Sequence, residues 1–186
     1  MESMPRVYSR GWPVADSATI APGAIAVLEP EPEPIVRTAR VADVPQIAEL
    51  VAYYAQQRNL LPRSISDIYQ SVREWVVAEI DGEIVACGSL LIMWADLAEV
   101  RSIAVKPDFQ GQGHGQAVVL ALVEEARRLG IPTVFCLTRA VPFFARLGFQ
   151  VTERDRFPRK VWKDCIHCPV FANCDEVAMV LPVTRE

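Results

Sequence analysis

The sequence lacks several features, and each absence argues against a class of protein. Positive charge is not in excess, because 19 lysine and arginine residues stand against 23 aspartate and glutamate residues, which argues against general nucleic-acid binding. No apolar run reaches the roughly 18 to 20 residues of a membrane span, and the N-terminus has neither the basic nor the apolar part of a secretory signal. We therefore expect a cytoplasmic protein that binds neither nucleic acid nor membranes.

An even set of cysteines is also lacking. The chain has five, and Cys87 and Cys136 lie inside apolar runs, which predicts buried thiols in a reducing compartment rather than a disulfide framework. The other three form the pattern Cys165-x-x-Cys168-x5-Cys174. A zinc ion needs four tetrahedral ligands. A redox pair of the first two cysteines and a reduced, tightly turned loop are the alternatives, so no metal is assigned.

The chain is long enough for one domain with a sizeable core. Residues 1–34 carry six prolines and end in the acidic repeat EPEPEP, so we expect a flexible extension there. The domain is predicted to span residues 35–186, with a cysteine-containing segment at about 155–175.

Strands and helices alternate within this domain. The segments with strand patterns are 35–40, 74–80, 83–94, 97–105, 133–138, 149–153 and 176–183. The segments with helical patterns are 44–57, 67–75, 113–129 and 141–148. Asp43 is the expected cap of the first helix and Ser64 or Ser66 that of the second, while Asp81-Gly82 predicts a hairpin. The order predicts a mixed α/β fold, with an antiparallel meander followed by a strand–helix–strand crossover.

A glycine-rich loop, QGQGHGQ at residues 110–116, lies between a predicted strand and a predicted helix. It is not a dinucleotide fingerprint, because Gln116 stands where the third glycine would be, and no P-loop lysine follows. Glycines still let several main-chain N–H groups converge on one anion at the positive end of the helix. A phosphate group is the natural ligand, and a glycine turn that binds nothing is the alternative.

The spacing Gln110-x-x-Gly113-x-Gly115 resembles the acyl-CoA loop of the GNAT superfamily of N-acetyltransferases, and FFARLGF at 143–149 resembles its second signature. The resemblance covers roughly residues 35–152. It implies a mostly antiparallel central sheet, flanked by helices, in which strands four and five splay apart to admit acetyl-CoA, and it suggests a homodimer. The residues that it assigns to acetyl-CoA are Ile103, Ala104, Val105, Gln110, Gly111, Gly113, His114, Gly115, Gln116 and Phe144.

Acetyl transfer to an amine needs a base, an oxyanion donor and a route for the leaving thiol. Glu99 stands six residues before Val105, so the two side chains are predicted to share a strand face, and the resemblance makes Glu99 the base. It also implies a strand bulge near Ala104 or Val105 that frees an N–H for the oxyanion. Phe144 stands where many family members have a proton-donating tyrosine, so Thr138 or an ordered water is the candidate acid.

A narrower resemblance concerns the acceptor. The segments NLLPRS at 59–64, LTRAVPFFARLGF at 137–149 and the cysteine tail resemble the short bacterial N-acetylglutamate synthases of arginine biosynthesis. Those enzymes acetylate the α-amino group of an amino acid, chiefly glutamate. Longer synthases carry an arginine-binding domain for which this chain has no room, so the sequence leaves arginine feedback open. The residues predicted to contact the amino acid are Arg63, Arg101, Ser102 and Lys160.

Each of these cations has an alternative explanation as a solvated surface charge. Two other functions also stay open. One is acetylation of a different amine, such as a drug, a polyamine or a protein N-terminus. The other is a non-catalytic acyl-CoA sensor, which would keep the loop but would not need Glu99.

Overall fold

A computed structural model describes residues 33–157, 165–167 and 173–183. The strands are β1 (Ile35–Thr38), β2 (Trp75–Ile80), β3 (Glu83–Trp94), β4 (Leu97–Val105), β5 (Thr133–Thr138), β6 (Gln150–Thr152) and β7 (Val177–Pro182). The α-helices are α1 (Val44–Gln56), α2 (Ile65–Gln70), α3 (His114–Arg128) and α4 (Val141–Arg146). Among the described helices, none is long and apolar enough to cross a membrane.

The strands form a seven-stranded sheet in the order β1-β2-β3-β4-β5-β7-β6. Neighbouring strands are antiparallel except for the pair β4 and β5, which is parallel and is joined through α3. The β2–β3 turn has positive φ at Asp81 and Gly82, 49° and 83°, as a two-residue hairpin of the predicted kind requires. The predicted mixed, mostly antiparallel sheet is confirmed.

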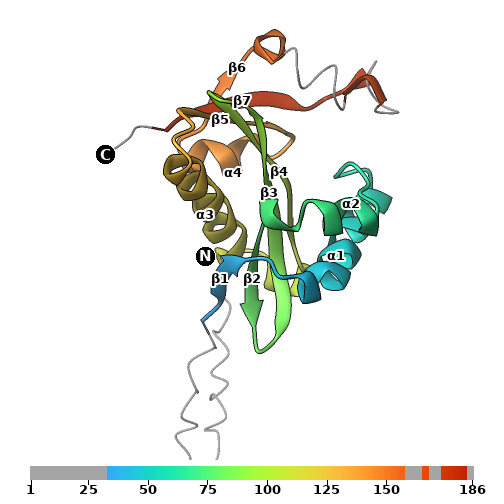
Figure 1. Cartoon of the computed structure of the whole chain (residues 1–186). Helices are drawn as coiled ribbons and strands as arrows, with labels where there is room; N and C mark the ends of the chain where they lie inside the picture. The colour runs from blue at the N-terminus through green and yellow to red at the C-terminus, as the bar shows by residue number, and fades with distance from the viewer. Residues whose placement is uncertain (1–32, 158–164, 168–172, 184–186) are drawn as a thin grey trace, which may run out of the picture. The chain divides into compact units, whose positions relative to one another are not determined.

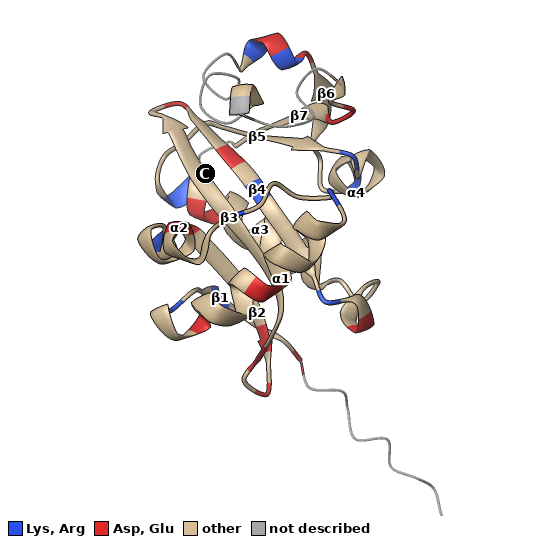
Figure 2. Ribbon diagram, turned by 90° about the vertical axis from the view of Figure 1, so that its right-hand side faces the viewer, with Lys and Arg blue, Asp and Glu red and all other residues tan. Residues whose placement is uncertain are grey.

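Helices cover both faces of the sheet (Figure 1). On one face α3 and α4 pack against the strands through Val118, Leu122 and Phe144. On the other face α1 and α2 pack through Ile47 and Ile68. These side chains are buried, and each fully buried aliphatic or aromatic side chain contributes about 1.5–3 kcal/mol. Figure 2 shows that acidic and basic residues are interspersed over the side it presents rather than gathered in a basic stripe.

The helix caps differ in part from the prediction. Ser64 caps α2, because its hydroxyl accepts the Asp67 N–H at 3.0 Å while the Asp67 carboxylate accepts the Ser64 N–H at 3.2 Å. Asp43 precedes α1 but makes no side-chain cap bond to it. Its carboxylate instead accepts hydrogen bonds from the Arg37 guanidinium at 2.6 and 2.9 Å and from the Arg40 N–H at 2.7 Å. Asp43 therefore joins β1 to the turn before α1.

Strands β4 and β5 separate soon after they meet. Within the described sheet they pair at two positions only, Ala98 with Val134 and Glu99 with Phe135. Beyond Glu99 the ladder between the two strands ends; Figure 1 labels both strands in the sheet. The predicted splay between strands four and five is thus present, and it opens a gap in the middle of the sheet.

Strand β4 also contains a bulge, next to the predicted position near Ala104 or Val105. Cys87 pairs with Ala104 but Ser89 pairs with Arg101, so Ser102 and Ile103 together oppose the single residue Gly88. Ser102 takes the left-handed φ of 54°. The bulge therefore lies just before Ala104 and Val105.

The bulge reverses the alternation of side chains along β4. Val100 belongs to the core on the α3 face, and three residues later Ile103 packs on that same face, as does Val105. Glu99 neighbours Val100 and so points to the opposite face. The prediction that Glu99 and Val105 share a face is wrong, because it assumed an unbroken strand. Arg101 comes before the bulge and does share the face of Glu99.

Candidate active site

A cavity of about 410 Å³ lies where β4 and β5 diverge. Its walls come from the end of α1 and the loop that follows, from β4, from the end of β5 with the turn into α4, and from the residue before β7. A small-molecule site has a volume of about 300–1,000 Å³, so the cavity is large enough to hold the reacting ends of two substrates.

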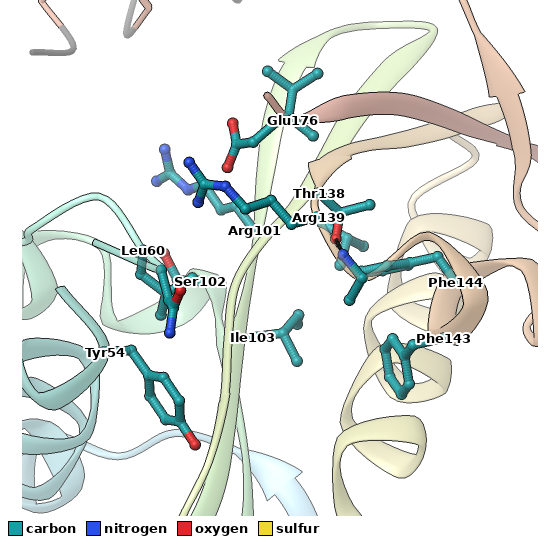
Figure 3. A pocket seen from close by; sticks show the side chains of 14 residues that line it. Tyr54, Leu60, Arg101, Ser102, Ile103, Thr138, Arg139, Phe143, Phe144 and Glu176 are labelled. Carbon is teal, nitrogen blue, oxygen red and sulfur yellow. Dashed lines mark hydrogen bonds between the residues drawn. The ribbon is translucent and has the colours of Figure 1, made fainter. Parts of the chain in front are cut away.

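The cavity has a polar end and an apolar end (Figure 3). Arg101, Arg139 and Glu176 line the polar end, and the apolar wall includes Ile103 and the aromatic rings of α4. A guanidinium nitrogen of Arg101 lies 3.0 Å from the Glu74 carboxylate. This arrangement can bind a ligand that carries carboxylate and ammonium groups at one end and an uncharged group at the other.

Arg139 is held in place by neighbours on two sides. Its Nε donates to Asp175 at 2.6 Å and its Nη1 donates to the main-chain carbonyl of Arg58 at 3.1 Å. The hydrogen bond from Arg139 also lowers the pKa of Asp175, so the pair is ionised at neutral pH. A guanidinium fixed in this way loses little conformational freedom when it binds a carboxylate.

The glycine-rich loop leads into α3 at one side of this gap. Gly111 and Gly113 have φ of 78° and 89°, a region that favours glycine. The first helical bond of α3 runs from the Ala117 N–H to the Gly113 carbonyl at 3.0 Å, so the N–H groups of the three residues between them precede the helical ladder. A Cβ at Gly115 would lie 3.1 Å from Val105 Cγ2, and glycine there lets α3 approach β4 closely.

His114 differs from the other members of the loop because its side chain is buried. Its ring lies 6.0 Å from the ring of Phe109, centroid to centroid, and its Nε2 is 3.1 Å from Gln112 Oε1. Only its main-chain N–H belongs to the row at the start of α3. The assignment of this row to a phosphate remains a prediction.

Glu99, the predicted base, is buried behind the cavity wall. Its side chain is buried, with 2% of the residue exposed, and among the described residues it is not part of the cavity wall. Burial, together with the charges of Glu99 and Glu176, raises the pKa of the Cys136 thiol. The carboxylates of Glu99 and Glu176 therefore both raise the pKa of Cys136 on β5. Of the two, only Glu176 belongs to the cavity wall that the described residues form.

Thr138 and Phe144 both line the cavity. Thr138 Oγ1 accepts the Ala140 N–H at 2.9 Å, which leaves its hydroxyl proton to donate elsewhere. Phe144 packs edge-to-face against Phe143 and Phe149, with ring centroids 5.0 and 5.2 Å apart. Phe144 is thus a rigid wall of the cavity, in keeping with its inability to donate a proton.

The remaining predicted positions lie around or beyond the cavity. Ser102 lines it at the bulge. Arg63 is half-buried in the loop before α2, outside the cavity wall that the described residues form. Lys160 and Cys168 lie outside the described residues, whereas Cys165 is buried, Cys174 is partly exposed, and neither forms a disulfide within the described ranges. Within the described ranges no three His, Cys, Asp or Glu side chains are grouped closely enough to hold a metal ion.

The cavity residues that were not predicted as site residues include Tyr54, Arg139 and Glu176. Arg139 follows directly after a predicted strand, and the ends of such strands are where α/β folds place ligand-binding groups, so this signal was available. Tyr54 fits the apolar periodicity of α1, so its sequence position gives no sign of a polar role. Its hydroxyl in fact donates to the Val105 carbonyl at 2.5 Å and accepts from Gln110 Nε2 at 2.6 Å.

Comparisons with known protein sequences agree with this geometry. Residues 41–149 match the family model described as Acetyltransferase (GNAT) family. An uncharacterised N-acetyltransferase of Chlorobaculum tepidum is 36% identical over 151 residues, which cover 81% of this chain and 97% of that protein. An amino-acid acetyltransferase of Mycobacterium tuberculosis is 44% identical over 123 residues, which cover 64% of this chain and 70% of that protein.

Solved structures give the same picture. Rv2747 of Mycobacterium tuberculosis, crystallised with CoA, is 35% identical with a TM-score of 0.70, and the match covers 81% of this chain and 100% of that one. N-acetylglutamate synthase of Neisseria gonorrhoeae, complexed with coenzyme A and N-acetyl-glutamate, is 27% identical with a TM-score of 0.72. That match covers 82% of this chain and 35% of the synthase, so this chain spans about a third of its length.

Proposed function

The chain belongs to the GNAT family of acetyltransferases, and from this premise we propose that it transfers the acetyl group of acetyl-CoA to the α-amino group of L-glutamate, for arginine biosynthesis. The observation that carries the proposal is the cavity between the splayed strands β4 and β5, with two arginines and a glutamate at one end and apolar side chains at the other. The names of the Mycobacterium tuberculosis and Neisseria gonorrhoeae relatives support an amino-acid acceptor.

The charges of the cavity favour an acidic amino acid over a cationic amine. Glutamate carries two carboxylates and one ammonium group, and the polar end offers Arg101 and Arg139 for the former and Glu176 for the latter. A polyamine carries no carboxylate for the two guanidinium groups, which already hold one carboxylate each, Glu74 and Asp175, and it would place its own cations beside them. The same pairing argument disfavours most cationic drugs.

The chemistry divides between the two ends of the cavity. The main-chain N–H groups at the start of α3 hold the pyrophosphate of acetyl-CoA, and Ile103, Phe143 and Phe144 enclose its acetyl end. Glu99 accepts the amine proton through an ordered water, because it is buried beside the cavity rather than in its wall. The amine nitrogen then attacks the thioester carbon.

The tetrahedral oxyanion forms next to the bulge, where the shifted register leaves a main-chain N–H of β4 outside the ladder. The carbon–sulfur bond then breaks. Thiols have a pKa of about 8.5, so CoA leaves as a thiolate. It then takes up the second proton of the amine nitrogen, directly or relayed by the Thr138 hydroxyl. No step needs a metal ion.

The test is a panel of amino acids and amines assayed with acetyl-CoA while free thiol is measured. We expect the highest kcat/KM with glutamate, a lower value with glutamine and aspartate, and none with polyamines. Activity confined to cationic amines would overturn the acceptor. Tight CoA binding without turnover of any amine would favour the non-catalytic sensor.

A further inference from the structure

The hydroxyl of Tyr54 lies where three parts of the site meet. The side chain comes from the end of α1 and lines the cavity (Figure 3). Its hydroxyl donates to the carbonyl of Val105, the last residue of β4, and accepts from the side-chain amide of Gln110, the first residue of the glycine-rich loop. One phenol thus joins a helix, a strand end and a loop that lie more than 50 residues from it in sequence.

The bond to Val105 falls on the side of β4 that faces the gap. The Lys106 N–H donates to the Val85 carbonyl at 2.8 Å, so Lys106 turns its main chain toward β3. Main-chain groups alternate in direction along a strand, and the groups of Val105 therefore point away from β3. The main-chain groups of Val105 point toward the gap between β4 and β5. There the Val105 carbonyl accepts the hydrogen bond from the Tyr54 hydroxyl.

The bond to Gln110 holds the start of the loop. Gln110 follows a short turn at Pro107–Phe109 and precedes the two residues of left-handed backbone that shape the loop. Its amide donates to the phenol oxygen, so its side chain is turned toward α1. Burial raises the pKa of Tyr54, which keeps the phenol protonated at neutral pH and able to donate to Val105 while it accepts from Gln110.

We propose that Tyr54 is a positioning residue for the binding of acetyl-CoA. Its hydroxyl holds Gln110 and the end of β4 in the arrangement that binds acetyl-CoA. The inference rests on the proposed function, since it names a further residue of the same site. Tyr54 acts through the loop and the strand, so its loss should weaken binding of the carrier and leave the acceptor and the chemical step nearly unchanged.

The test is isothermal calorimetry with CoA on wild-type protein and on the variant Tyr54→Phe, which keeps the ring and its packing. A hydrogen bond of this kind contributes enough for the Kd to rise about threefold to tenfold. The KM for acetyl-CoA should rise to the same extent, with kcat and the KM for the amino acid within about twofold of wild type. If Tyr54 had a purely structural role, Tyr54→Phe would not change the Kd for CoA and the KM for acetyl-CoA more than kcat and the KM for the amino acid.

Tyr53→Phe is the matched control, because Tyr53 is the adjacent residue of α1 and is 45% exposed. It should leave the Kd within about twofold of wild type. The variant Gln110→Ala tests whether Tyr54 affects CoA binding through Gln110. If Tyr54 acts through Gln110, the double variant should lose less affinity than the product of the two single losses.

The outcomes separate the inference from the proposed function. Equal CoA affinity of wild type and Tyr54→Phe would overturn the inference alone, and so would losses that multiply in the double variant or a fall in kcat without a change in KM. Failure of the wild-type protein to bind CoA would overturn the proposed function and the inference together.

Discussion

Gly88 offers a sharp test of the bulge that shapes the site. It lies on β3 opposite Ser102 and Ile103. A Cβ placed there would overlap Cδ1 of Ile103, and it would lie 2.9 Å from Val118 Cγ1 and 3.1 Å from Leu122 Cδ1. The variant Gly88→Ala therefore forces one extra methyl group between the bulge and α3.

The expected cost follows from that crowding. Overpacking a closely packed core destabilises by about 1–3 kcal/mol. In a domain of this size each kcal/mol lowers the midpoint of thermal unfolding by about 2–4 °C, so the midpoint should fall by about 2–12 °C. Because Ile103 lines the cavity, the KM for acetyl-CoA should rise as well.

A double-mutant cycle makes the prediction refutable. Ile103→Val removes the Cδ1 atom that a Cβ at Gly88 would overlap, at a cost of about 0.5–1.5 kcal/mol by itself. Combined with Gly88→Ala it should relieve the overlap, so that the double variant is less destabilised than the sum of the two single changes. Urea unfolding measures all four proteins. Additive losses, within about 0.5 kcal/mol, would show that the two residues do not meet and would refute the described register.

Three further predictions concern the base, the acceptor and acid stability. Glu99→Gln should lower kcat about 100-fold or more with CoA affinity unchanged by calorimetry; full turnover would favour the sensor. Arg139→Gln should raise the KM for glutamate about tenfold or more, whereas exposed Arg146→Gln should not; equal effects would contradict the acceptor site. The pKa of Asp43 is lowered, chiefly by hydrogen bonds from Arg37. The pair therefore stabilises the fold fully at pH values above the ordinary carboxyl pKa of 3.8, and this stabilisation is lost as the pH falls through the lowered pKa of Asp43 in the folded protein. Urea unfolding between pH 7 and pH 3 should show a larger loss in wild type than in Asp43→Asn, and losses of equal size would contradict the assignment.

The strands and the hairpin could be predicted because their signals are local. The bounds of β4 and β5 coincide with the predicted segments 97–105 and 133–138, since each is an apolar or alternating run between turn residues. The Asp81-Gly82 turn has a backbone that few other pairs adopt easily. The loop before α3 was recognised from glycine spacing, which reports directly on main-chain conformation.

The features that escaped prediction depend on two segments at once. The bulge was expected only from the family resemblance, because it is a mismatch in length between β3 and β4 and no pattern within β4 alone reveals it. Its effect on the face of Glu99 was therefore missed. Tyr54 fits the apolar periodicity of α1, and its polar end acquires a role only when Val105 and Gln110 are brought to it by the fold. Asp43 was expected to cap a helix because it immediately precedes the helical segment. Its actual partner, Arg37, lies on the preceding strand, and no local pattern links the two residues.

The separation of β4 from β5 gives the sheet a third open edge, in addition to those of β1 and β6. Outer edges tend to recruit strands from other molecules, but this one lies in the middle of the sheet, between helices on both faces. It can therefore stay hydrated without inviting aggregation. This edge also favours acyl donors whose arm carries amides, because the N–H and C=O groups of such an arm can make the hydrogen bonds that water would otherwise make there. A short thioester, however reactive, lacks these groups.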